Sequence, residues 1–272
     1  VRKKEHRPEQ GSRSGDHINA SDNNREQGWS IDQVIAATGG KLANGNPAAI
    51  FRAISTDSRS VANGALFVAL RGDNFDGEKF CGEAVRLGAA GVLVTEVPKP
   101  PLDVPVIVVD DTLQALGDLA AIRRAGMQDL RVLAITGSSG KTTVKEMVAT
   151  ILRIENRVLV TKGNLNNHIG VPLTLLELEA EHDCAVIELG ASGLGEIAYT
   201  VRMALPHVAV LTNAAAPHIE GFGDLDGVVR TKGEIIDGLH DKGVAVLNAE
   251  DPHFAVWAAR AGDKRMVSFA VD

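Results

Sequence analysis

The segment from Thr136 to Thr143, TGSSGKTT, has the composition of a phosphate-binding loop. It lies between an apolar run, RVLAIT, and a run with helical character, VKEMVATIL. A glycine-rich turn between a strand and a helix aims backbone N–H groups and the positive end of the helix dipole at one point. That point is a predicted site for the phosphates of a nucleotide.

The residue types of this loop predict separate roles. Gly137 and Gly140 let the backbone approach the phosphates, Lys141 would lie over the β- and γ-phosphates, and the Thr142 hydroxyl would reach a magnesium ion. Ile135 stands where the common P-loop has its first glycine, so the spacing is the shorter G-x-x-G-K-T-T. The alternative is a strand-to-helix turn that contains GKTT by chance. The predicted nucleotide-binding residues of the loop are Gly137, Ser138, Ser139, Gly140, Lys141, Thr142 and Thr143.

Two further side chains are expected at the carboxyl edge of the same sheet. Glu188 ends an apolar run, and α/β proteins present catalytic groups at the carboxyl ends of strands. A carboxylate there can hold a hard divalent cation. His218 follows the next apolar run and would lie at the same edge, although a histidine after a strand is usually a hydrogen-bonded loop residue.

The elements that must position these residues are short apolar strands that alternate with helical segments. Nearly continuous β-branched runs of this kind are typical of a parallel sheet covered on both faces. The sequence therefore predicts an α/β fold with a mostly parallel sheet flanked by helices. The predicted strands of this unit are 131–136, 157–161, 183–190, 207–213, 243–248 and 265–271.

A smaller α/β unit precedes the phosphate loop. A helix is predicted from Ser30 to Thr38, with Ser30 as N-cap and Gly39-Gly40 as its end. Strands are expected at 65–70, 90–96 and 104–110, and helices at 77–87 and 112–125. The predicted organisation is a polar, aperiodic and disordered leader over 1–28, an N-terminal unit over 29–111 and a central unit over 112–272.

Composition excludes several classes of function. The formal net charge of -7 argues against broad binding to nucleic acid or to an anionic membrane. No apolar run reaches about 18 residues and the N-terminus lacks a signal-peptide pattern, so no membrane insertion and a cytoplasmic location are expected. Cys81 and Cys184 are far apart, which predicts two buried, reduced thiols rather than a disulfide or zinc site.

Several ordered motifs carry a resemblance to a known family. They are STDSR (55–59), LFVALRGDNFDG (66–77), the phosphate loop, GNLNNHIGVPLTLL (163–176), VIELGASGLGEI (186–197), AAPHIEGFG (215–223) and TKGEI (231–235). In order and spacing they resemble the Mur ligase family, over roughly residues 30 to 272. Folylpolyglutamate synthetases share the short phosphate loop, but that alternative does not predict STDSR or GNLNNHIGVPLTLL.

The resemblance implies roles for residues outside the loop. Thr142, Glu188 and His218 would be metal ligands, and Lys141, His218 and Lys232 would be catalytic. Lys232 would carry a carbamate made from carbon dioxide, with a helix-surface lysine as the alternative. Other residues would contact ligands: Asn164 and especially Asn167 the substrate or the nucleotide phosphates, Asn248 and Asp251 the adenine side, and Ser55, Asp57, Ser58 and Arg59 the UDP-sugar end of the substrate. Glu250 departs from the family, which usually has Asp there.

The implied reaction is an ATP-dependent amide ligation with Mg2+ as cofactor. The motif sequences resemble those of the ligases that join D-alanyl-D-alanine to UDP-N-acetylmuramoyl-tripeptide through an acyl phosphate. In such ligases a third domain follows the central one, whereas this chain ends at Asp272. The two expectations are therefore an amide ligase, acting as a monomer, and a non-catalytic remnant that binds nucleotide and UDP-substrate. The C-terminal ligase domain is expected to be absent.

Overall fold

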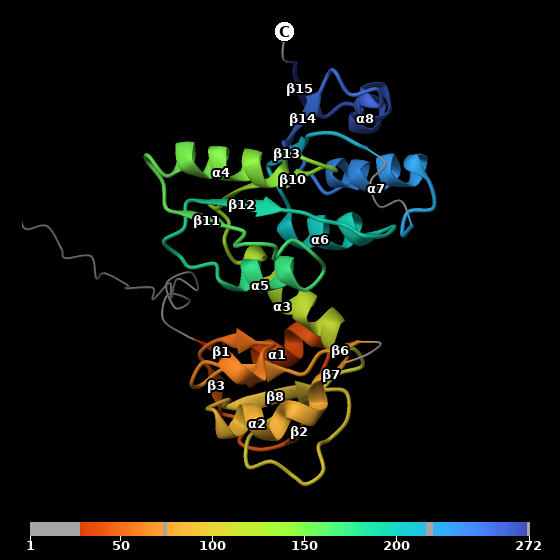
Figure 1. Ribbon diagram of the computed structural model, residues 1–272. Coiled ribbons are helices and arrows are strands. Elements are labelled where there is room, and N and C mark those ends of the chain that lie inside the picture. Colours follow the sequence, from red (N-terminus) through yellow and green to blue (C-terminus); the bar gives the residue numbers. More distant parts are fainter. Residues whose placement is uncertain (1–27, 73–74, 216–219, 271–272) are drawn as a thin grey trace, which may run out of the picture.

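The computed structural model describes residues 28–72, 75–215 and 220–270, so the predicted leader lies almost wholly outside the described residues. The chain forms two large sheets one after the other, and helix α3 (Thr112–Ala125) lies between them (Figure 1). The first sheet has the order β2-β9-β8-β5-β4 and the second β11-β12-β10-β13-β14-β15. An α/β fold with a parallel sheet flanked by helices is thus confirmed.

The first sheet is parallel except at one edge, where β2 runs antiparallel to β9. Short antiparallel pairs, β1 with β3 and β6 with β7, lie beside it. Elements of this region are β1 (Trp29–Ser30), α1 (Ile31–Thr38), β2 (Lys41–Asn44), β3 (Ile50–Phe51), β4 (Ile54–Ser55), η1 (Ser58–Ser60), β5 (Leu66–Val68), β6 (Arg71–Gly72), β7 (Phe75–Asp76), η2 (Gly77–Phe80), α2 (Cys81–Arg86), β8 (Gly91–Val94) and β9 (Val106–Val108).

Local chemistry fixes the ends of α1 as the sequence predicts. Ser30 Oγ accepts a hydrogen bond from Gln33 N, and Gln33 Oε1 accepts one from Ser30 N, which forms a capping box. The helix ends at Gly39, whose φ of 67° is in the left-handed region that glycine adopts without strain. The predicted helix at 77–87 differs in detail, because it opens with the 3-10 turn η2 before α2 begins.

All strand pairs of the second sheet are parallel. The strand order reverses beside β10, because the chain first passes to β11 and β12 on one side and then to β13 on the other. The remaining elements are β10 (Arg131–Thr136), α4 (Lys141–Leu152), β11 (Val158–Val160), α5 (Gly170–Leu176), β12 (Cys184–Glu188), α6 (Glu196–Ala204), β13 (Val208–Leu211), α7 (Leu225–Asp237), β14 (Val244–Asn248), α8 (Phe254–Ala261) and β15 (Arg265–Phe269). Such a switch point is where open α/β sheets bind ligands.

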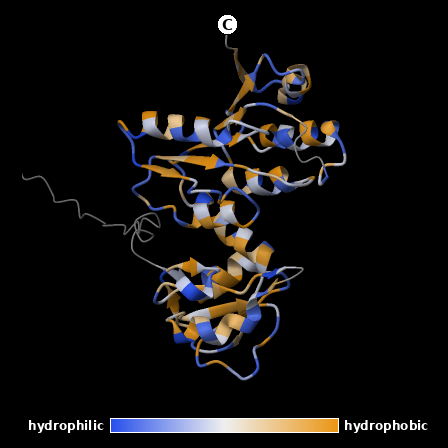
Figure 2. Cartoon of the chain, viewed as in Figure 1, coloured by the Kyte–Doolittle hydropathy of each residue, from blue (hydrophilic) through white to orange (hydrophobic). Residues whose placement is uncertain are grey.

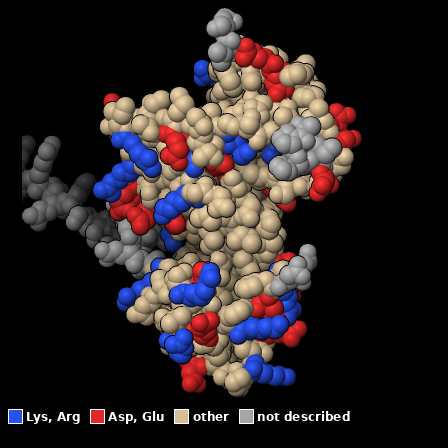
Figure 3. Space-filling model, in the orientation of Figure 1, with Lys and Arg blue, Asp and Glu red and all other residues tan. Residues whose placement is uncertain are grey.

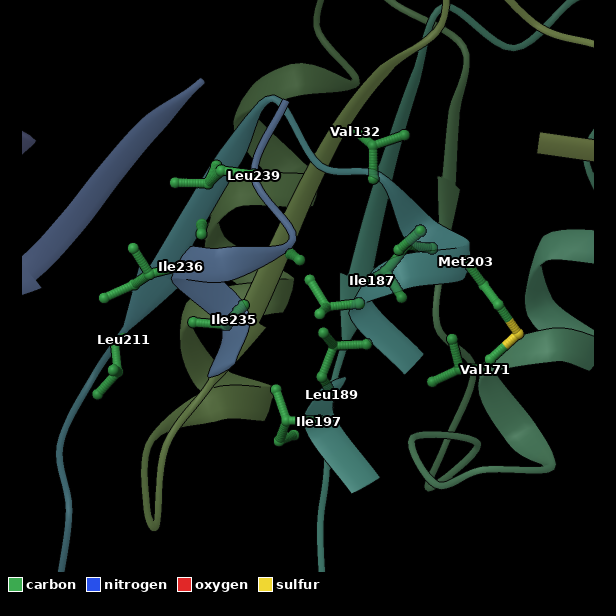
Figure 4. Close-up of a cluster of buried hydrophobic side chains, with 14 of the residues drawn as sticks. Val132, Val171, Ile187, Leu189, Ile197, Met203, Leu211, Ile235, Ile236 and Leu239 are labelled. Carbon is green, nitrogen blue, oxygen red and sulfur yellow. The ribbon is translucent and has the colours of Figure 1, made fainter. Parts of the chain in front are cut away.

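The two faces of the second sheet carry different cores. Helices α5, α6, α7 and α8 cover one face, where Ile187 and Leu189 meet Ile197, Ile235 and Ile236 (Figure 4). Helix α4 packs on the other face, over Ile135, Val186 and Val210. Figure 2 shows the apolar residues concentrated along the strands. Fully burying one such aliphatic side chain stabilises a fold by about 1.5–3 kcal/mol.

Helix α3 belongs to both cores. Its Leu116 and Leu119 pack with the apolar residues of the first sheet, whereas its Ala120 packs with those of the second. Asp111 caps the helix, because its Oδ1 accepts hydrogen bonds from Leu113 N and Gln114 N. The domain boundary between residues 111 and 112 remains a prediction, since this helix contributes to both units.

Two expectations from composition can be compared with the described residues. Cys81 and Cys184 are both buried and free, as predicted. Acidic and basic side chains are interspersed on the face of the molecule shown in Figure 3. Among helices in the described ranges, none combines the length and apolar character needed to cross a bilayer.

Candidate nucleotide and metal site

The phosphate loop has the predicted strand–turn–helix geometry. Strand β10 ends at Thr136, α4 begins at Lys141, and the turn between them contains two glycines in the left-handed region, Gly137 with φ 149° and Gly140 with φ 79°. A β-carbon at Gly137 would collide with Thr212 Oγ1, so this position requires glycine. The first turn of α4 leaves the N–H groups of Lys141, Thr142 and Thr143 without an intrahelical acceptor, which suits an anion.

The loop that follows β13 holds the phosphate loop in place. Asn213 Oδ1 accepts hydrogen bonds from Ser139 N at 3.0 Å and Ser139 Oγ at 3.2 Å. Thr212 Oγ1 donates to Ser139 O at 2.7 Å, and Ser138 Oγ donates to Ala215 O at 3.1 Å. Sequence reasoning missed Thr212 and Asn213. The hydroxyls of Ser138 and Ser139 bond to protein groups here, so their contact with phosphate remains a prediction.

Lys141 lies folded across the loop that it follows. Its Nζ donates a hydrogen bond of 2.8 Å to Gly137 O, and Ser138 O lies 3.5 Å away. The side chain is half-buried at the N-terminus of α4. An ammonium at the centre of the loop, held only by carbonyl oxygens, is placed to exchange those contacts for phosphate oxygens.

A buried carboxylate lies beside the loop at the end of β12. Glu188 is 1% exposed, its Oε2 accepts a hydrogen bond of 3.0 Å from Thr142 Oγ1, and its Oε1 accepts one of 2.8 Å from Asn166 Nδ2. The structure thus brings together Thr142 and Glu188, two of the three predicted metal ligands. His218, the third, lies outside the described residues. Hydroxyl, carboxylate and amide oxygens form a donor set that fits a hard cation such as Mg2+.

A second lysine of α4 also reaches this carboxylate. Lys145 is fully buried, and its Nζ lies 3.6 Å from Glu188 Oε2. Sequence reasoning missed this residue. The signal was present, because Lys145, Val148, Ala149 and Leu152 recur at helical spacing on the face of α4 that packs against the sheet.

Lys232 is a buried residue of α7, so the alternative of a helix-surface lysine is wrong. Its exposed fraction is 4%, and its Nζ lies 5.7 Å from the centroid of the Phe222 ring. Burial and, to a smaller extent, the positive charge of Lys141 lower the pKa of Lys232 to about 8, while Glu196 acts in the opposite direction. The electrostatic coupling to Lys141 connects Lys232 with the phosphate loop.

The asparagines before α5 have different local roles. Asn167, the one that sequence reasoning favours as a ligand contact, lies in the turn before α5, where its Oδ1 accepts hydrogen bonds from Ile169 N and Gly170 N. Asn166 instead reaches Glu188, and its N donates to Asn164 O at 2.7 Å. Ligand contacts of Asn164 and Asn167 remain predictions.

The predicted adenine-side residues, Asn248 and Asp251, form hydrogen bonds to the backbone of the loop that follows β13. Asn248 Nδ2 donates a hydrogen bond of 3.0 Å to Thr212 O, and Asp251 Oδ2 accepts one of 2.9 Å from Ala214 N. Asp251 Oδ1 accepts a further bond from His253 N, and the residue is 7% exposed. These bonds connect the end of β14 to the phosphate loop through the β13 loop. An adenine contact by Asn248 or Asp251 remains a prediction.

The predicted UDP-sugar residues lie on one turn after β4. Asp57 and Arg59 form a two-pronged ion pair, with Arg59 Nε and Nη2 each 2.9 Å from a carboxylate oxygen. The Arg59 side chain is 82% exposed, and its hydrogen bonds lower the pKa of Asp57 to about 2. Ser58 is buried near Glu83, whereas Ser55 bonds within the turn. Arg59 is therefore the member of this group most available to an anionic ligand.

Comparisons with known proteins agree with this geometry. The family model for the "Mur ligase middle domain" matches residues 135–272, and that for the "Mur ligase family, catalytic domain" matches residues 51–124. The UDP-N-acetylmuramoyl-tripeptide–D-alanyl-D-alanine ligase of Escherichia coli (strain K12) is 48% identical over 218 residues, which are 80% of this chain and 48% of that relative. The ligase of the same name from Bacillus subtilis (strain 168) is 40% identical over 226 residues, 82% of this chain and 49% of the relative.

Solved structures give the same result. MurF from Acinetobacter baumannii superposes with a TM-score of 0.85 and 40% identity, over 89% of this chain and 53% of that chain. MurF ligase from Thermotoga maritima, in complex with ADP, has a TM-score of 0.73 and 32% identity, over 80% and 50% of the two chains. The chain spans about half the length of the curated relatives it matches. With a middle-domain match over half its length, a phosphate loop and a buried carboxylate beside it, the chain belongs to the Mur ligase family.

Proposed function

We propose that this chain provides the ATP-binding and UDP-substrate-binding parts of an ATP-dependent ligase of peptidoglycan synthesis. The ligase would join D-alanyl-D-alanine to UDP-N-acetylmuramoyl-tripeptide, as a monomer in the cytoplasm. The observation that carries the proposal is the contact between the phosphate loop and Glu188, through Thr142 Oγ1 at 3.0 Å. The names of the relatives support the choice of substrates.

In the proposed reaction, an oxygen of the tripeptide's terminal carboxylate attacks the γ-phosphorus of ATP. The bond from that phosphorus to the bridging oxygen of ADP breaks, which leaves an acyl phosphate and ADP. The amine of D-alanyl-D-alanine then attacks the acyl carbon, loses a proton and expels inorganic phosphate. The protein's contribution is alignment of two anions, together with charge neutralisation by Lys141.

Magnesium, when bound, would neutralise charge on the phosphate oxygens and help align them with the carboxylate. Thr142 and Glu188 are the described residues that would hold it, and His218 is the third predicted ligand. The fit rests on their chemistry, because Glu188 is a buried anion that already faces the hydroxyl of the loop.

Binding of the UDP-substrate tests this function against the alternatives. The chain is expected to bind UDP-N-acetylmuramoyl-tripeptide, and Arg59→Ala should weaken that binding about tenfold, because loss of a charged hydrogen bond costs about 1.5–3 kcal/mol. Isothermal titration calorimetry measures both affinities. Arg86→Ala is the matched control, since Arg86 is an exposed arginine of the same unit.

Titration with folate, UDP-tripeptide and nucleotide, together with a turnover assay, distinguishes the proposed ligase from a folylpolyglutamate synthetase and from a non-catalytic remnant. A folylpolyglutamate synthetase would bind a folate and ignore the UDP-tripeptide, and such a result would contradict the proposal. A non-catalytic remnant would bind UDP-tripeptide and nucleotide, so it is distinguished by turnover rather than by binding.

Carbamylation of Lys232 is the second expectation of this proposal. A free amine is needed to attack carbon dioxide, and with a pKa of about 8 roughly one Lys232 side chain in ten is neutral at pH 7. An ordinary lysine, with a pKa of about 10.4, would be neutral only about once in 2,500. The charge of Lys141, which lowers this pKa, would also stabilise the anionic carbamate.

Labelled bicarbonate makes this modification visible. The carbonyl signal of a carbamate in the 13C NMR spectrum is expected to grow as the pH rises through about 8, because deprotonation of the ammonium precedes attack. Lys232→Met should abolish the signal, and Lys242→Met, which removes an exposed lysine, should leave it unchanged. A signal that survives Lys232→Met would assign the modification elsewhere.

A further inference from the structure

Lys145 is a buried cation that the proposed reaction does not use. The residue is 0% exposed, and its Nζ donates a hydrogen bond of 2.9 Å to Thr161 O at the end of β11. Two carboxylates lie near the same nitrogen, Glu146 Oε1 at 3.1 Å and Glu188 Oε2 at 3.6 Å. An ammonium removed from water in this way is costly unless an anion compensates it.

Of these two carboxylates, Glu188 is the effective partner. The Glu146 side chain is 56% exposed, so water and salt screen its charge. The Glu188 side chain is 2% exposed and shares the low-dielectric interior with Lys145, where charge interactions are stronger. The pair therefore places one full positive charge 3.6 Å from an oxygen of the carboxylate proposed to bind the metal.

Glu188 is held from several sides. Thr142 and Lys145 approach Oε2, Asn166 donates to Oε1, and the backbone N of Glu188 donates to Thr161 Oγ1 at 3.0 Å. Thr161 thus contacts both members of the pair, because its carbonyl accepts the bond from Lys145 Nζ. These contacts fix the orientation of the carboxylate.

We propose that Lys145 is a built-in counter-ion of Glu188, which stabilises the carboxylate while no metal is bound and opposes binding of the metal without nucleotide. A divalent cation that contacts Glu188 would lie close to the ammonium, and like charges repel. The negative charge of ATP offsets that repulsion, so the metal enters together with ATP. Lys145 is accordingly a positioning residue, and the inference rests on the proposed function only in taking Glu188 as a metal ligand.

Thermal unfolding with Mg2+ as the sole ligand tests the inference. Lys145→Met keeps most of the length of the side chain but removes its charge, and should lower the Tm by about 5–10 °C in metal-free buffer, because it leaves a buried anion uncompensated. Addition of about 10 mM MgCl2 should raise the Tm of the wild type by less than about 1 °C and that of Lys145→Met by about 3 °C or more. That difference corresponds to metal binding at least about fivefold tighter in the variant.

Two control variants make the result specific. Lys162 follows Thr161 in the sequence, and its side chain is 70% exposed. Lys162→Met should therefore behave as the wild type does, with and without Mg2+. The double variant Lys145→Met/Glu188→Gln removes both charges of the buried pair. It should regain most of the lost Tm and show no response to Mg2+, because neither uncompensated charge remains.

Three outcomes would overturn the inference. A wild-type Tm for Lys145→Met would show that Glu188 needs no counter-ion. An Mg2+ response equal to that of the wild type would show that Lys145 does not oppose the metal. If Lys145→Met fails to fold, a folded double variant supports the counter-ion role, and an unfolded double variant assigns Lys145 to packing. Nucleotide and muramoyl substrates are absent from this experiment, so a failure to bind those ligands or to ligate them would not produce any of these outcomes.

Discussion

Replacing Lys141 with alanine is expected to weaken binding of MgATP at least about 100-fold while the fold persists. Charge-assisted hydrogen bonds to phosphate each contribute about 1.5–3 kcal/mol, and one ammonium at the centre of the loop can make two of them. The fold should tolerate the change, because Lys141 Nζ bonds only to carbonyl oxygens of its own loop, Gly137 O and Ser138 O. Calorimetric titration with a non-hydrolysable ATP analogue in Mg2+ measures the affinity.

Lys242→Ala is the matched control for this prediction. Lys242 is exposed and precedes β14, so it lies at the edge of the parallel sheet opposite the phosphate loop. Its removal should leave the affinity for nucleotide unchanged, and the Tm of both variants should stay close to that of the wild type. Unchanged nucleotide affinity in Lys141→Ala would remove the assignment of TGSSGKTT as a phosphate-binding loop.

The parts of this site that lie close together in sequence could be predicted. The turn from β10 to α4 places Gly137, Lys141 and Thr142 within one local motif, and local backbone rules are enough to predict its shape. The strand positions were likewise evident, because apolar β-branched runs are continuous where both faces of a sheet are covered. Glu188 was predicted at the carboxyl end of its strand for the same reason.

The contacts between distant segments could not be predicted from these patterns. Asn213 holds Ser139 across 74 positions of sequence, and this contact exists only because β13 pairs with β10. Strand order is a property of the whole sheet, and no periodicity within β13 encodes it. The sequence likewise does not indicate which asparagine reaches Glu188, because Asn166 and Asn167 are equally good turn residues and only the packing of α5 decides which amide faces the carboxylate.

The polypeptide of residues 1–272, prepared alone, is expected to bind ATP and UDP-N-acetylmuramoyl-tripeptide but to ligate D-alanyl-D-alanine slower than a full-length relative by several orders of magnitude. In the proposed function, the phosphate loop binds the nucleotide, and Glu188 and Thr142 hold the metal. Arg59 is available for the UDP-substrate. The relatives that carry the ligase name are about twice as long as the segment that matches them.

The size of the expected loss follows from what ligation demands. The amine of D-alanyl-D-alanine must be held within about 3 Å of the acyl carbon, and effective molarities of well-placed reactants reach about 10⁵ M or more. The resemblance to Mur ligases implies that a further domain binds the incoming amine and closes over ATP. Without that closure the rate advantage is lost, and water reaches the acyl phosphate. The polypeptide should therefore hydrolyse ATP slowly, in a manner that depends on the tripeptide substrate.

Phosphate release and mass spectrometry of the muramoyl product, measured in parallel, separate hydrolysis from ligation. Slow tripeptide-dependent phosphate release with little pentapeptide product is the expected pattern, and Lys141→Ala should abolish the release because it removes nucleotide binding. If phosphate release does not depend on the tripeptide, the polypeptide binds nucleotide without forming the acyl phosphate. Rapid formation of the pentapeptide product by residues 1–272 would show instead that these residues bind D-alanyl-D-alanine themselves, and that closure by a further domain is dispensable for alignment.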